Sequence, residues 1–275
     1  MTSTPDISAI ILAAGKGTRM NSDLPKVVHP VGGRPMIRAV VQACLAAGCA
    51  RVVVVVGHMQ HLVREALADL RCEFVEQREQ LGTGHAVTFA APLFRREAAE
   101  QGHRVLVLCG DGPLVRERTL RGLVDRHASA DAAATLATAV VENPAGYGRI
   151  VRDRSGRFER IVEHKNANQA ERAIREVNPS YYCFDAQALF AALPRLPRNS
   201  LTGEYYVTDV LALFLQDGRR VEVVEGVPPD DVLSINTPED LARVDAIFRA
   251  RLAPTGAAAG TGGVEGRGEV GGPRR

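Results

Sequence analysis

Three short runs of mainly β-branched and other apolar residues constrain the fold more than any other feature of this chain. They are residues 7–12 (ISAIIL), 51–56 (RVVVVV) and 104–109 (RVLVLC). Each is short and continuous, as expected for a strand that is covered on both faces. Helical patterns and one short strand, 73–76, lie between and after them; the helices are expected at 35–47, 59–70, 84–96 and 117–129. This alternation predicts an α/β fold with a mainly parallel sheet between two helical layers.

The second half of the chain predicts strands in closer succession. They are expected at 133–141, 149–152, 158–163 and 176–184, and they indicate an extension of the sheet or a second, smaller lobe. Helices near 185–193, 207–217 and 238–252 and a strand at 220–225 complete a predicted domain of residues 1–252. The last 23 residues, 253–275, contain eight glycines and few large apolar side chains, so we expect a disordered tail.

Charge and cysteine content exclude several classes of protein. The 34 basic and 32 acidic side chains leave a net charge of +2, too small a bias to predict nucleic acid or a membrane as a partner. The five cysteines form no CxxC pair, so we expect free thiols rather than a metal site or a disulfide framework. The apolar run near the N-terminus is far shorter than the ~20 residues of a membrane helix. We therefore expect a cytoplasmic enzyme.

A glycine loop, LAAGKGTRM at residues 12–20, directly follows the first strand. Small residues let a backbone approach a ligand closely, and successive amides there can bind phosphate. A dinucleotide fingerprint would need glycine at Met20, and an NTPase phosphate loop would end in Gly-Lys-Ser/Thr. Two interpretations remain: a phosphate-binding loop with its own cations, Lys16 and Arg19, or a plain turn with surface charges.

Lysine is scarce in this chain, and its positions are informative. Lys16, Lys26 and Lys165 are the three lysines, and the other 31 of the 34 basic residues are arginines. Lys26 lies in SDLPKVVHPVGG, where the preceding proline stiffens the backbone. A fixed cation near a phosphate-binding loop suits an α-phosphate or a sugar phosphate, whereas a lone lysine is usually a surface residue.

Two further loops lie beyond predicted strands. EQLGTGHA (79–86) opens a helix, and its backbone together with Gln77 is suited to read the edge of a base. CGDGPL (109–114) lies at the end of the sheet where ligands gather in open α/β folds. Asp111 there suits Mg²⁺, which takes one or two carboxylates plus substrate phosphates. The alternative is an aspartate that caps a turn before Pro113.

Four later segments carry weaker signals: GYGRI (146–150), VEHK (162–165), EVNPSYY (176–182) and GEYYVTD (203–209). With the earlier motifs they stand in the order and approximate spacing of a known family. Residues 7–250 resemble the sugar-1-phosphate nucleotidyltransferases. They are most similar to the uridylyltransferase half of the bacterial bifunctional uridylyltransferase/acetyltransferase family that makes UDP-N-acetylglucosamine. All three lysines fall within the shared motifs, as expected if arginine cannot replace them.

The resemblance implies a Rossmann-like, doubly wound sheet of the sugar nucleotidyltransferase type with a smaller sugar-binding lobe. It also implies a role for each matched position. The catalytic residues would be Arg19 and Lys26, and the Mg²⁺ ligands would be Asp111 and Asn236. The nucleotide would be bound by Leu12, Ala13, Ala14, Gly15, Lys16, Gln77, Gly82 and Thr83. The sugar would be bound by Gly148, Glu163, Asn178, Tyr206 and Thr208.

The implied reaction transfers a uridylyl group from UTP to N-acetylglucosamine 1-phosphate, with Mg²⁺ as cofactor and pyrophosphate as the second product. The sugar phosphate is already an anion at neutral pH, so no general base is required. Two alternatives stay open: an NDP-sugar pyrophosphorylase with another base or sugar phosphate, and a catalytically silent UDP-sugar sensor. The expected partners are the small substrates, and the expected state is monomer or dimer.

This chain departs from the family pattern near the sugar. Cys109 stands at a usual aromatic, Gly112 at a β-branched or larger residue, and Asn166 at a usual aspartate. Asn178-Pro179-Ser180 replaces an Asn-x-Gly pattern. The segment 232–242, which carries Asn236, is more similar to the wider superfamily. The family's left-handed β-helix acetyltransferase half has no counterpart in the sequence, so no acetyl transfer is expected.

Overall fold

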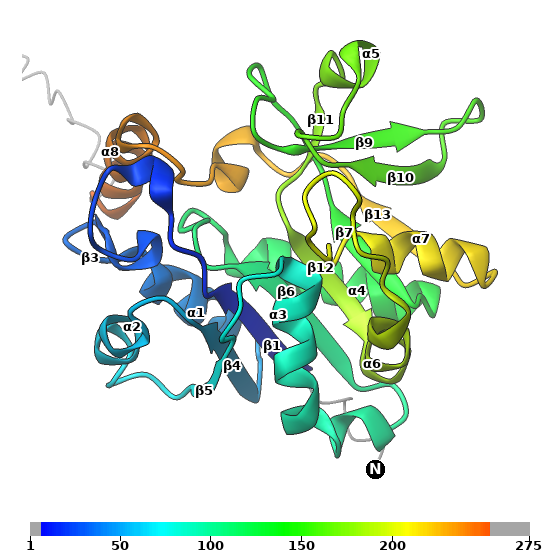
Figure 1. Cartoon of the computed structure of the whole chain (residues 1–275), viewed down its shortest axis with the longest axis horizontal. Helices are drawn as coiled ribbons and strands as arrows, with labels where there is room; N and C mark the ends of the chain where they lie inside the picture. The colour runs from blue at the N-terminus through cyan, green and yellow to red at the C-terminus, as the bar shows by residue number, and fades with distance from the viewer. Residues whose placement is uncertain (1–6, 254–275) are drawn as a thin grey trace, which may run out of the picture.

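A computed structural model describes residues 7–253 of the chain and shows a seven-stranded main sheet (Figure 1). The strand order is β13-β7-β12-β6-β1-β4-β5. The strands are β1 (Ile7–Ala13), β4 (Arg51–Val56), β5 (Glu73–Glu76), β6 (Arg104–Cys109), β7 (Ala134–Ala137), β12 (Tyr181–Asp185) and β13 (Val221–Val224). β12 is antiparallel to both of its neighbours and all other pairs are parallel, which confirms the predicted mainly parallel α/β sheet.

The register of the central strands creates the edge on which the site is built. Leu12 at the end of β1 pairs with Val55 of β4 on one side and with Cys109 of β6 on the other. These three strands are buried along nearly their whole length, because their side chains face helices on both sides. The loops that follow them therefore emerge together at one edge of the sheet.

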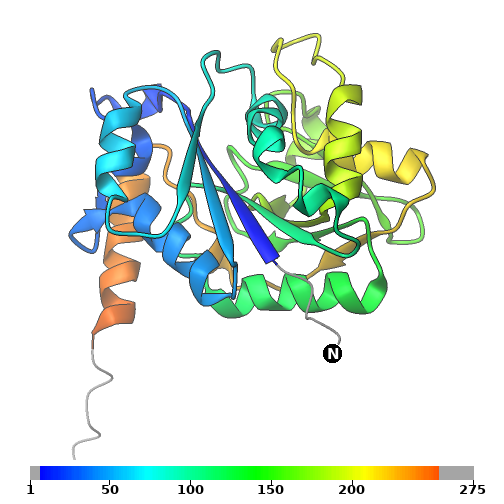
Figure 2. The ribbon, with the colours of Figure 1, turned by 90° about the horizontal axis from the view of Figure 1, so that it is seen from below.

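Helices cover both faces of this sheet, as the alternation predicts. α1 (Met36–Ala46), α2 (Gln60–Ala66) and α4 (Glu117–Ala130) pack on one face. α3 (Thr83–Ala90), α6 (Ala186–Ala192) and α7 (Asp209–Gln216) pack on the other. Figure 2 shows α1 and α4 below the sheet and α3 and α7 above it. Short 3-10 helices complete the connections: η1 (Thr18–Met20), η2 (Lys26–Val28), η3 (Ala91–Phe94), η4 (Glu97–Ala99), η5 (Leu193–Arg195) and η6 (Pro229–Val232).

A second, antiparallel sheet forms the smaller lobe. Its order is β10-β9-β11-β8, from β8 (Ala139–Val140), β9 (Gly148–Arg152), β10 (Phe158–Val162) and β11 (Glu176–Asn178), with the short helix α5 (Gln169–Arg172) beside it. Figure 1 shows this sheet above the end of the main sheet that carries β12 and β7.

The predictions of single strands at 133–141 and 176–184 were wrong. Each run breaks and passes from one sheet to the other, as β7 to β8 and as β11 to β12.

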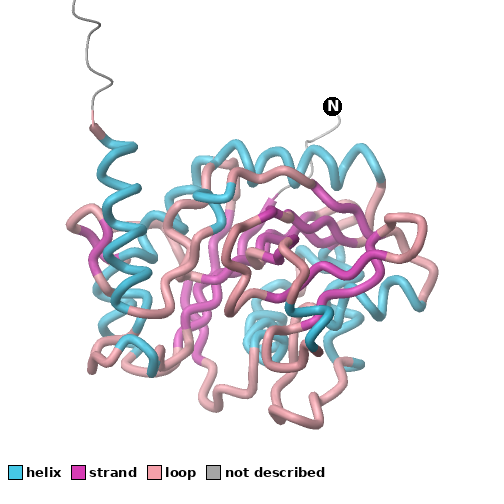
Figure 3. The backbone as a smooth tube through the Cα atoms, turned by 90° about the horizontal axis from the view of Figure 1, so that it is seen from above, coloured by secondary structure: helices cyan, strands magenta, loops and turns pink. Residues whose placement is uncertain are grey.

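The helix α8 (Pro238–Leu252) closes the other end of the molecule (Figure 3). It packs on the hairpin β2 (Pro30–Val31) and β3 (Arg34–Pro35) through a small core that includes Met36, Leu114, Ile235 and Val244. Within residues 7–253, no helix is long and apolar enough to cross a membrane. The tail predicted from Ala253 onward lies outside the described residues except for Ala253 itself.

The structure explains why glycine stands at position 112. A Cβ added there would lie 3.0 Å from the hydroxyl oxygen of Tyr181. Tyr181 is 1% exposed, and its hydroxyl donates to the backbone oxygen of Asp231 at 2.9 Å. The buried tyrosine therefore takes the space that a larger residue at position 112 would need.

We predict that Gly112→Ala destabilises the fold by about 1–3 kcal/mol, the usual cost of overpacking a buried site. In a Tyr181→Phe background the same change loses less stability, because the hydroxyl that the new Cβ would meet is gone. Urea unfolding of the two single variants, the double variant and the unmutated protein measures this coupling. Equal penalties in both backgrounds would contradict the explanation.

Candidate functional site

The loop after β1 lines a cavity at the edge of the main sheet. Leu12, Ala13, Ala14 and Gly15 form one wall of this 260 Å³ space. The opposite walls come from the ends of β5 and β6 and the start of α3; they are Gln77, Gln80, Gly82, Thr83, Ala86, Cys109 and Asp111. Residues of the glycine loop and of the first turn of α3 thus line a single space. Backbone amides of such segments suit phosphate and the edge of a base.

Glycine is required at position 17 for two reasons. Its φ is +65°, in the left-handed region that other residues adopt only with strain. A Cβ there would also lie 2.5 Å from the Cβ of Lys26. The glycine loop therefore passes directly over Lys26 and holds this residue close to the cavity.

Lys26 lies at the centre of a cluster of polar side chains. Its ammonium donates to the Asp111 carboxylate and, at 3.0 Å, to the amide oxygen of Asn236. Arg19 donates to the same Asn236 oxygen at 2.9 Å. The side chains of Lys26 and Asp111 are 17% and 18% exposed, so their charges are only partly screened by water. The four predicted residues thus converge on one point, although they come from segments far apart in the sequence.

The position of Asn236 is determined by its backbone surroundings. Ile235 donates its backbone N–H to the backbone oxygen of Asp111 at 2.9 Å, which joins the two loops directly. On the other side, Thr237 caps α8 in a capping box with Asp240. The Asp240 carboxylate also accepts from the Asn236 N–H at 3.0 Å. Asn236 is therefore fixed between a helix start and the loop that carries Asp111.

Asp111 and Asn236 fit a hard cation. Their oxygens already face the same cationic group, the Lys26 ammonium. Carboxylate and amide oxygens are the donors that Mg²⁺ prefers, and Mg²⁺ typically keeps waters or substrate phosphates as its other ligands. Within residues 7–253 no group of three or more His, Cys, Asp or Glu side chains is arranged to hold a metal. A metal here would thus need oxygens of a bound phosphate as well.

A larger cavity of 710 Å³ opens on the other side of Lys26 and Arg19. Three residues predicted to bind the sugar line it: Glu163, Tyr206 and Thr208. Several others in its wall are not among the predicted site residues: Gly17, Thr18, Gly146, His164, Ser180, Tyr182, Glu204 and Val207. All eight lie within the quoted motifs. Their participation depends on where the small lobe sits, which no local pattern reports.

Burial shapes the chemistry of this larger cavity. It raises the pKa of the Glu163 carboxyl above its ordinary value, and the hydroxyl of Thr208, which donates to Glu163 at 3.3 Å, only partly offsets that effect. Burial also lowers the pKa of His164. Lys165 lies in the same wall, 3.9 Å from Glu204. The lining of this cavity therefore combines cations, Arg19, Lys26 and Lys165, with the carboxyl of Glu163.

The turn from β11 to β12 forms despite the missing glycine. Ser180 adopts φ +63°, the left-handed conformation for which glycine is favoured. The side chain of Asn178 supports the turn by accepting from the Ser180 N–H at 3.0 Å. Burial raises the pKa of the Cys109 thiol to about 12, and the influence of Ser180, which acts in the opposite direction, is smaller. Cys109 is thus a neutral thiol near neutral pH.

Apart from Asn236, three predicted positions do not line either cavity. Lys16 is exposed on the glycine loop, and Gly148 and Asn178 lie next to each other in the small sheet. Asn178 also donates to the Tyr182 hydroxyl at 2.6 Å, so both ends of its amide are used within the protein. The contribution of these three residues to binding stays a prediction.

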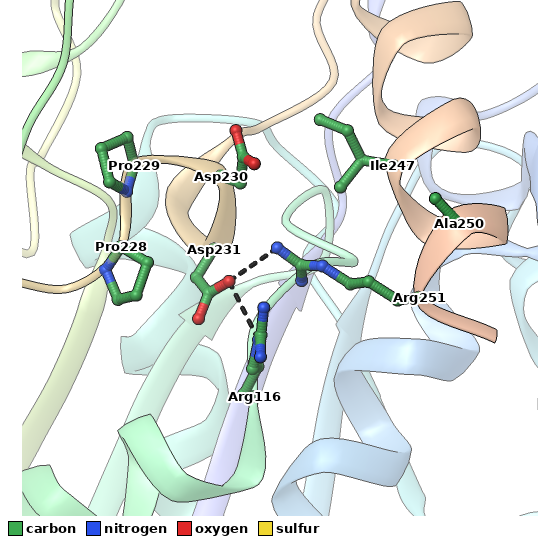
Figure 4. A pocket seen from close by; sticks show the side chains of 8 residues that line it. All are labelled: Arg116, Pro228, Pro229, Asp230, Asp231, Ile247, Ala250 and Arg251. Carbon is green, nitrogen blue, oxygen red and sulfur yellow. Dashed lines mark hydrogen bonds and ion pairs between the residues drawn. The ribbon is translucent and has the colours of Figure 1, made fainter. Parts of the chain in front are cut away.

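A buried carboxylate holds the loop that leads to Asn236. Asp231 is 0% exposed, and its Oδ1 accepts from Arg116 at 3.0 Å and from Arg251 of α8 at 2.7 Å (Figure 4). These residues border a cavity of 550 Å³ that shares no lining residue with the two described above. The two arginines join α8 and the start of α4 to this loop. We call Asp231, Arg116 and Arg251 the Asp231 clamp.

Comparison with known proteins shows the family to which the chain belongs. A family model described as "MobA-like NTP transferase domain" matches residues 9–197. A relative named "Bifunctional protein GlmU" from Bacillus cereus strain G9842 is 46% identical over 244 residues, which is 89% of this chain. A relative of the same name from Geobacter metallireducens is 47% identical over 250 residues, or 90% of this chain. The chain spans about half the length of these relatives, 52% and 51%.

Solved structures share the fold at lower sequence identity. A putative glucose-1-phosphate thymidylyltransferase from Bacillus anthracis, in complex with a sucrose, superposes with a TM-score of 0.71 at 21% identity, covering 88% of this chain and 95% of its own. A UDP-glucose pyrophosphorylase complexed with UDP-glucose gives 0.70 at 18% identity, covering 90% of this chain and all of its own. Both show that sugar nucleotidyltransferases have this arrangement of sheet and helices.

We predict that Asp231→Ala lowers the free energy of unfolding by about 2–3 kcal/mol, the range for lost hydrogen bonds to a buried charged group. Arg116 and Arg251 are 39% and 24% exposed, so both can be hydrated when the carboxylate is gone, which limits the loss. Urea unfolding measures the change. Arg249→Ala is the matched control on α8, because Arg249 pairs with Asp245 at the surface and such pairs contribute only ~0–1 kcal/mol. A loss no larger than that of the control would show that the Asp231 clamp does not hold the loop.

Proposed function

We propose that this chain transfers a uridylyl group from UTP to N-acetylglucosamine 1-phosphate. The chain belongs to the family of MobA-like NTP transferase domains and is thus a nucleotidyltransferase. The products would be UDP-N-acetylglucosamine and pyrophosphate. The proposal includes a cytoplasmic location and a role in supplying a precursor of peptidoglycan. It rests on the quoted motifs and on relatives named as the bifunctional protein, of which this chain spans about half.

The observation that carries the proposal is the convergence of Lys26, Arg19, Asp111 and Asn236 at one point. Lys26 lines both cavities, so its ammonium marks the place where two ligands would meet. The smaller cavity would take the nucleotide and the larger one the sugar phosphate. This is where a transfer between two phosphate-bearing substrates has to occur.

The chemistry requires charge neutralisation more than proton transfer. A phosphate oxygen of the sugar phosphate attacks the α-phosphorus of UTP, a new P–O bond forms, and the bond to the bridging oxygen breaks as pyrophosphate leaves. The nucleophile is already an anion, so no general base has to act on it. Lys26 and Arg19 would stabilise the charge that builds up on the α-phosphoryl group, and the two cavities would hold the reactants in line.

Asp111 and Asn236 would hold Mg²⁺ together with phosphate oxygens of the nucleotide. When bound, the ion would neutralise charge on those oxygens. The Lys26 ammonium, which contacts both residues, would then remain beside them as a second cation. Backbone groups of residues 12–15 and of Gly82 and Thr83 would hold the nucleotide, and Glu163, Tyr206 and Thr208 would contact the sugar.

Ser180 and Cys109 supply the observation that favours a second candidate. Both differ from the family pattern; Ser180 lines the larger cavity and Cys109 lines the smaller one. A different sugar phosphate, another base, or binding without turnover would each be compatible with such a change.

The decisive experiment measures pyrophosphate release for four NTPs against several sugar 1-phosphates, with Mg²⁺ and with excess EDTA. Fast release with UTP and N-acetylglucosamine 1-phosphate, abolished by EDTA, is the expected result; another best pair, or none, would refute the proposal.

Lys26→Arg should be severe although it conserves charge. The ammonium is a compact point charge between two oxygens, and a wide planar guanidinium has no equivalent position there. Loss of one placed contact to a transition state typically costs ~10²–10³ in rate, so we expect kcat to fall at least roughly a hundredfold.

The control for this variant is Arg154→Lys, an exposed residue in the turn between β9 and β10, which should leave kcat unchanged. Circular dichroism of both variants checks that the fold is retained. A kcat for Lys26→Arg within a few-fold of the unmutated value would remove Lys26 from the catalytic residues.

Sugar binding should weaken at low pH through Glu163. Burial raises its pKa, so the carboxylate is protonated, and loses acceptor capacity, at a higher pH than an exposed glutamate. We expect the KM for the sugar phosphate to rise as the pH falls, and to begin rising at a higher pH than protonation of an exposed glutamate would cause. The substrate phosphate also titrates near pH ~6, so Glu163→Gln, which has no titration of its own, is the reference at each pH. Parallel KM profiles for the two proteins would show that Glu163 does not contribute.

A further inference from the structure

The side chain of Gln77 has a single possible orientation at the nucleotide cavity. Gln77 follows β5 and is 3% exposed. Its amide nitrogen donates to the backbone oxygen of Gly82 at 3.2 Å and contacts Nδ1 of His85 at 3.0 Å. A carbonyl oxygen can only accept, so the nitrogen of the amide, and not its oxygen, has to face Gly82.

This orientation also determines the state of His85. The amide nitrogen of Gln77 has two hydrogens, one for Gly82 and one for His85. Nδ1 of His85 must therefore accept, which places the ring proton on Nε2. Both donors of Gln77 are then used within the protein. Its Oε1 has no donor among residues 7–253 and is the polar atom that this side chain keeps for a ligand.

The ring of His85 is held by its neighbours. It packs edge-on against Phe89 of α3, with ring centroids 4.9 Å apart, and is stacked with Tyr205 at 6.3 Å. Tyr205 is itself tied to this loop, because Gly84 donates its N–H to the Tyr205 oxygen at 2.8 Å. His85 therefore cannot turn away easily, and its Nδ1 remains directed at Gln77.

The cavity wall consequently offers an acceptor beside donors. Oε1 of Gln77 is the acceptor, and the backbone amides of Gly82 and Thr83, at the open start of α3, are donors without helical partners. An imide base such as uracil or thymine has an N3–H flanked by carbonyl oxygens and matches this pattern. Cytosine has a lone pair at N3, which would face the acceptor Oε1, and a 4-amino group, which would face the amide donors. Neither pair can form a hydrogen bond.

We infer that His85 is a positioning residue: by accepting from Gln77, it holds the amide so that the cavity selects imide bases over cytosine. The inference rests on the proposed function only in that a pyrimidine nucleotide binds beside Gln77. Without the acceptor on His85, the Gln77 amide can turn over and present its nitrogen to the base. UTP would then lose its partner while CTP would gain one.

The test compares kcat/KM and the dissociation constant for UTP and CTP, the latter by calorimetry so that binding is measured even without turnover. His85→Phe keeps an aromatic ring but removes the acceptor. We expect the UTP-over-CTP preference to fall at least tenfold, mainly through KM, with kcat little changed. His85→Asn places an amide oxygen near the position of Nδ1 and should restore much of the preference. Phe89→Leu keeps the acceptor and the stacking of His85 on Tyr205, so it is the control and should lose much less of the preference than His85→Phe.

The outcomes separate this inference from the proposed function. An unchanged UTP-over-CTP preference in His85→Phe would show that His85 is merely structural. The same conclusion would follow if UTP and CTP binding weakened equally in both His85→Phe and Phe89→Leu. An unmutated protein that prefers CTP would also overturn the inference. A preference for dTTP over UTP would refute uridylyl transfer while the selection of imide bases still held.

Discussion

The site is organised around one cation, the ammonium of Lys26. It contacts a carboxylate that lies 85 residues away and an amide oxygen that lies 210 residues away. A partly buried carboxylate such as that of Asp111 is costly without a counter-charge, so the pair couples the folding of the segment that contains η2 to that of the loop after β6. Lys26 also lines both cavities. Stability of this region and the capacity to neutralise phosphate thus have a common origin.

The scaffold holds these groups through backbone contacts more than through side chains. The hydrogen bond from Ile235 to the oxygen of Asp111 joins the last part of the domain to the central strands. The hydroxyl of Tyr181 and the Asp231 clamp hold the preceding residues of the same segment. Because Gly112 leaves room for Tyr181, a departure from the family pattern becomes part of this support. The reacting centre is therefore built on rigid elements, which favours precise positioning.

The two cavities differ in what they demand of their ligands. The smaller cavity, which we propose for the nucleotide, is lined by the glycine loop, by the start of α3 and by Gln77, whose orientation is determined by Gly82 and His85. The larger cavity, which we propose for the sugar phosphate, is lined by residues of the small lobe and of the segment before α7, including Glu163. Backbone recognition tolerates sequence change, whereas recognition by side chains does not. A change of substrate in a relative with this fold therefore requires changes of side chain in the larger cavity. Ser180 is one of the residues that line it.

The sequence by itself determined the alternation of buried strands and helices, the glycine loop and the residues that meet at Lys26. Each of those features is a local pattern. An apolar run, a glycine that needs positive φ or close approach, and a charge at a strand end can each be recognised from a few neighbouring residues. The tertiary structure alone decided that residues 133–141 and 176–184 each divide between two sheets, since a strand-like pattern does not tell which neighbour it pairs with. It also decided which side chains of the small lobe line the larger cavity and how His85 orients Gln77. Those outcomes depend on contacts between segments that are distant in sequence. The physical reason is that packing sets which strands pair and in which direction a side chain forms its hydrogen bonds. A single segment does not encode that packing.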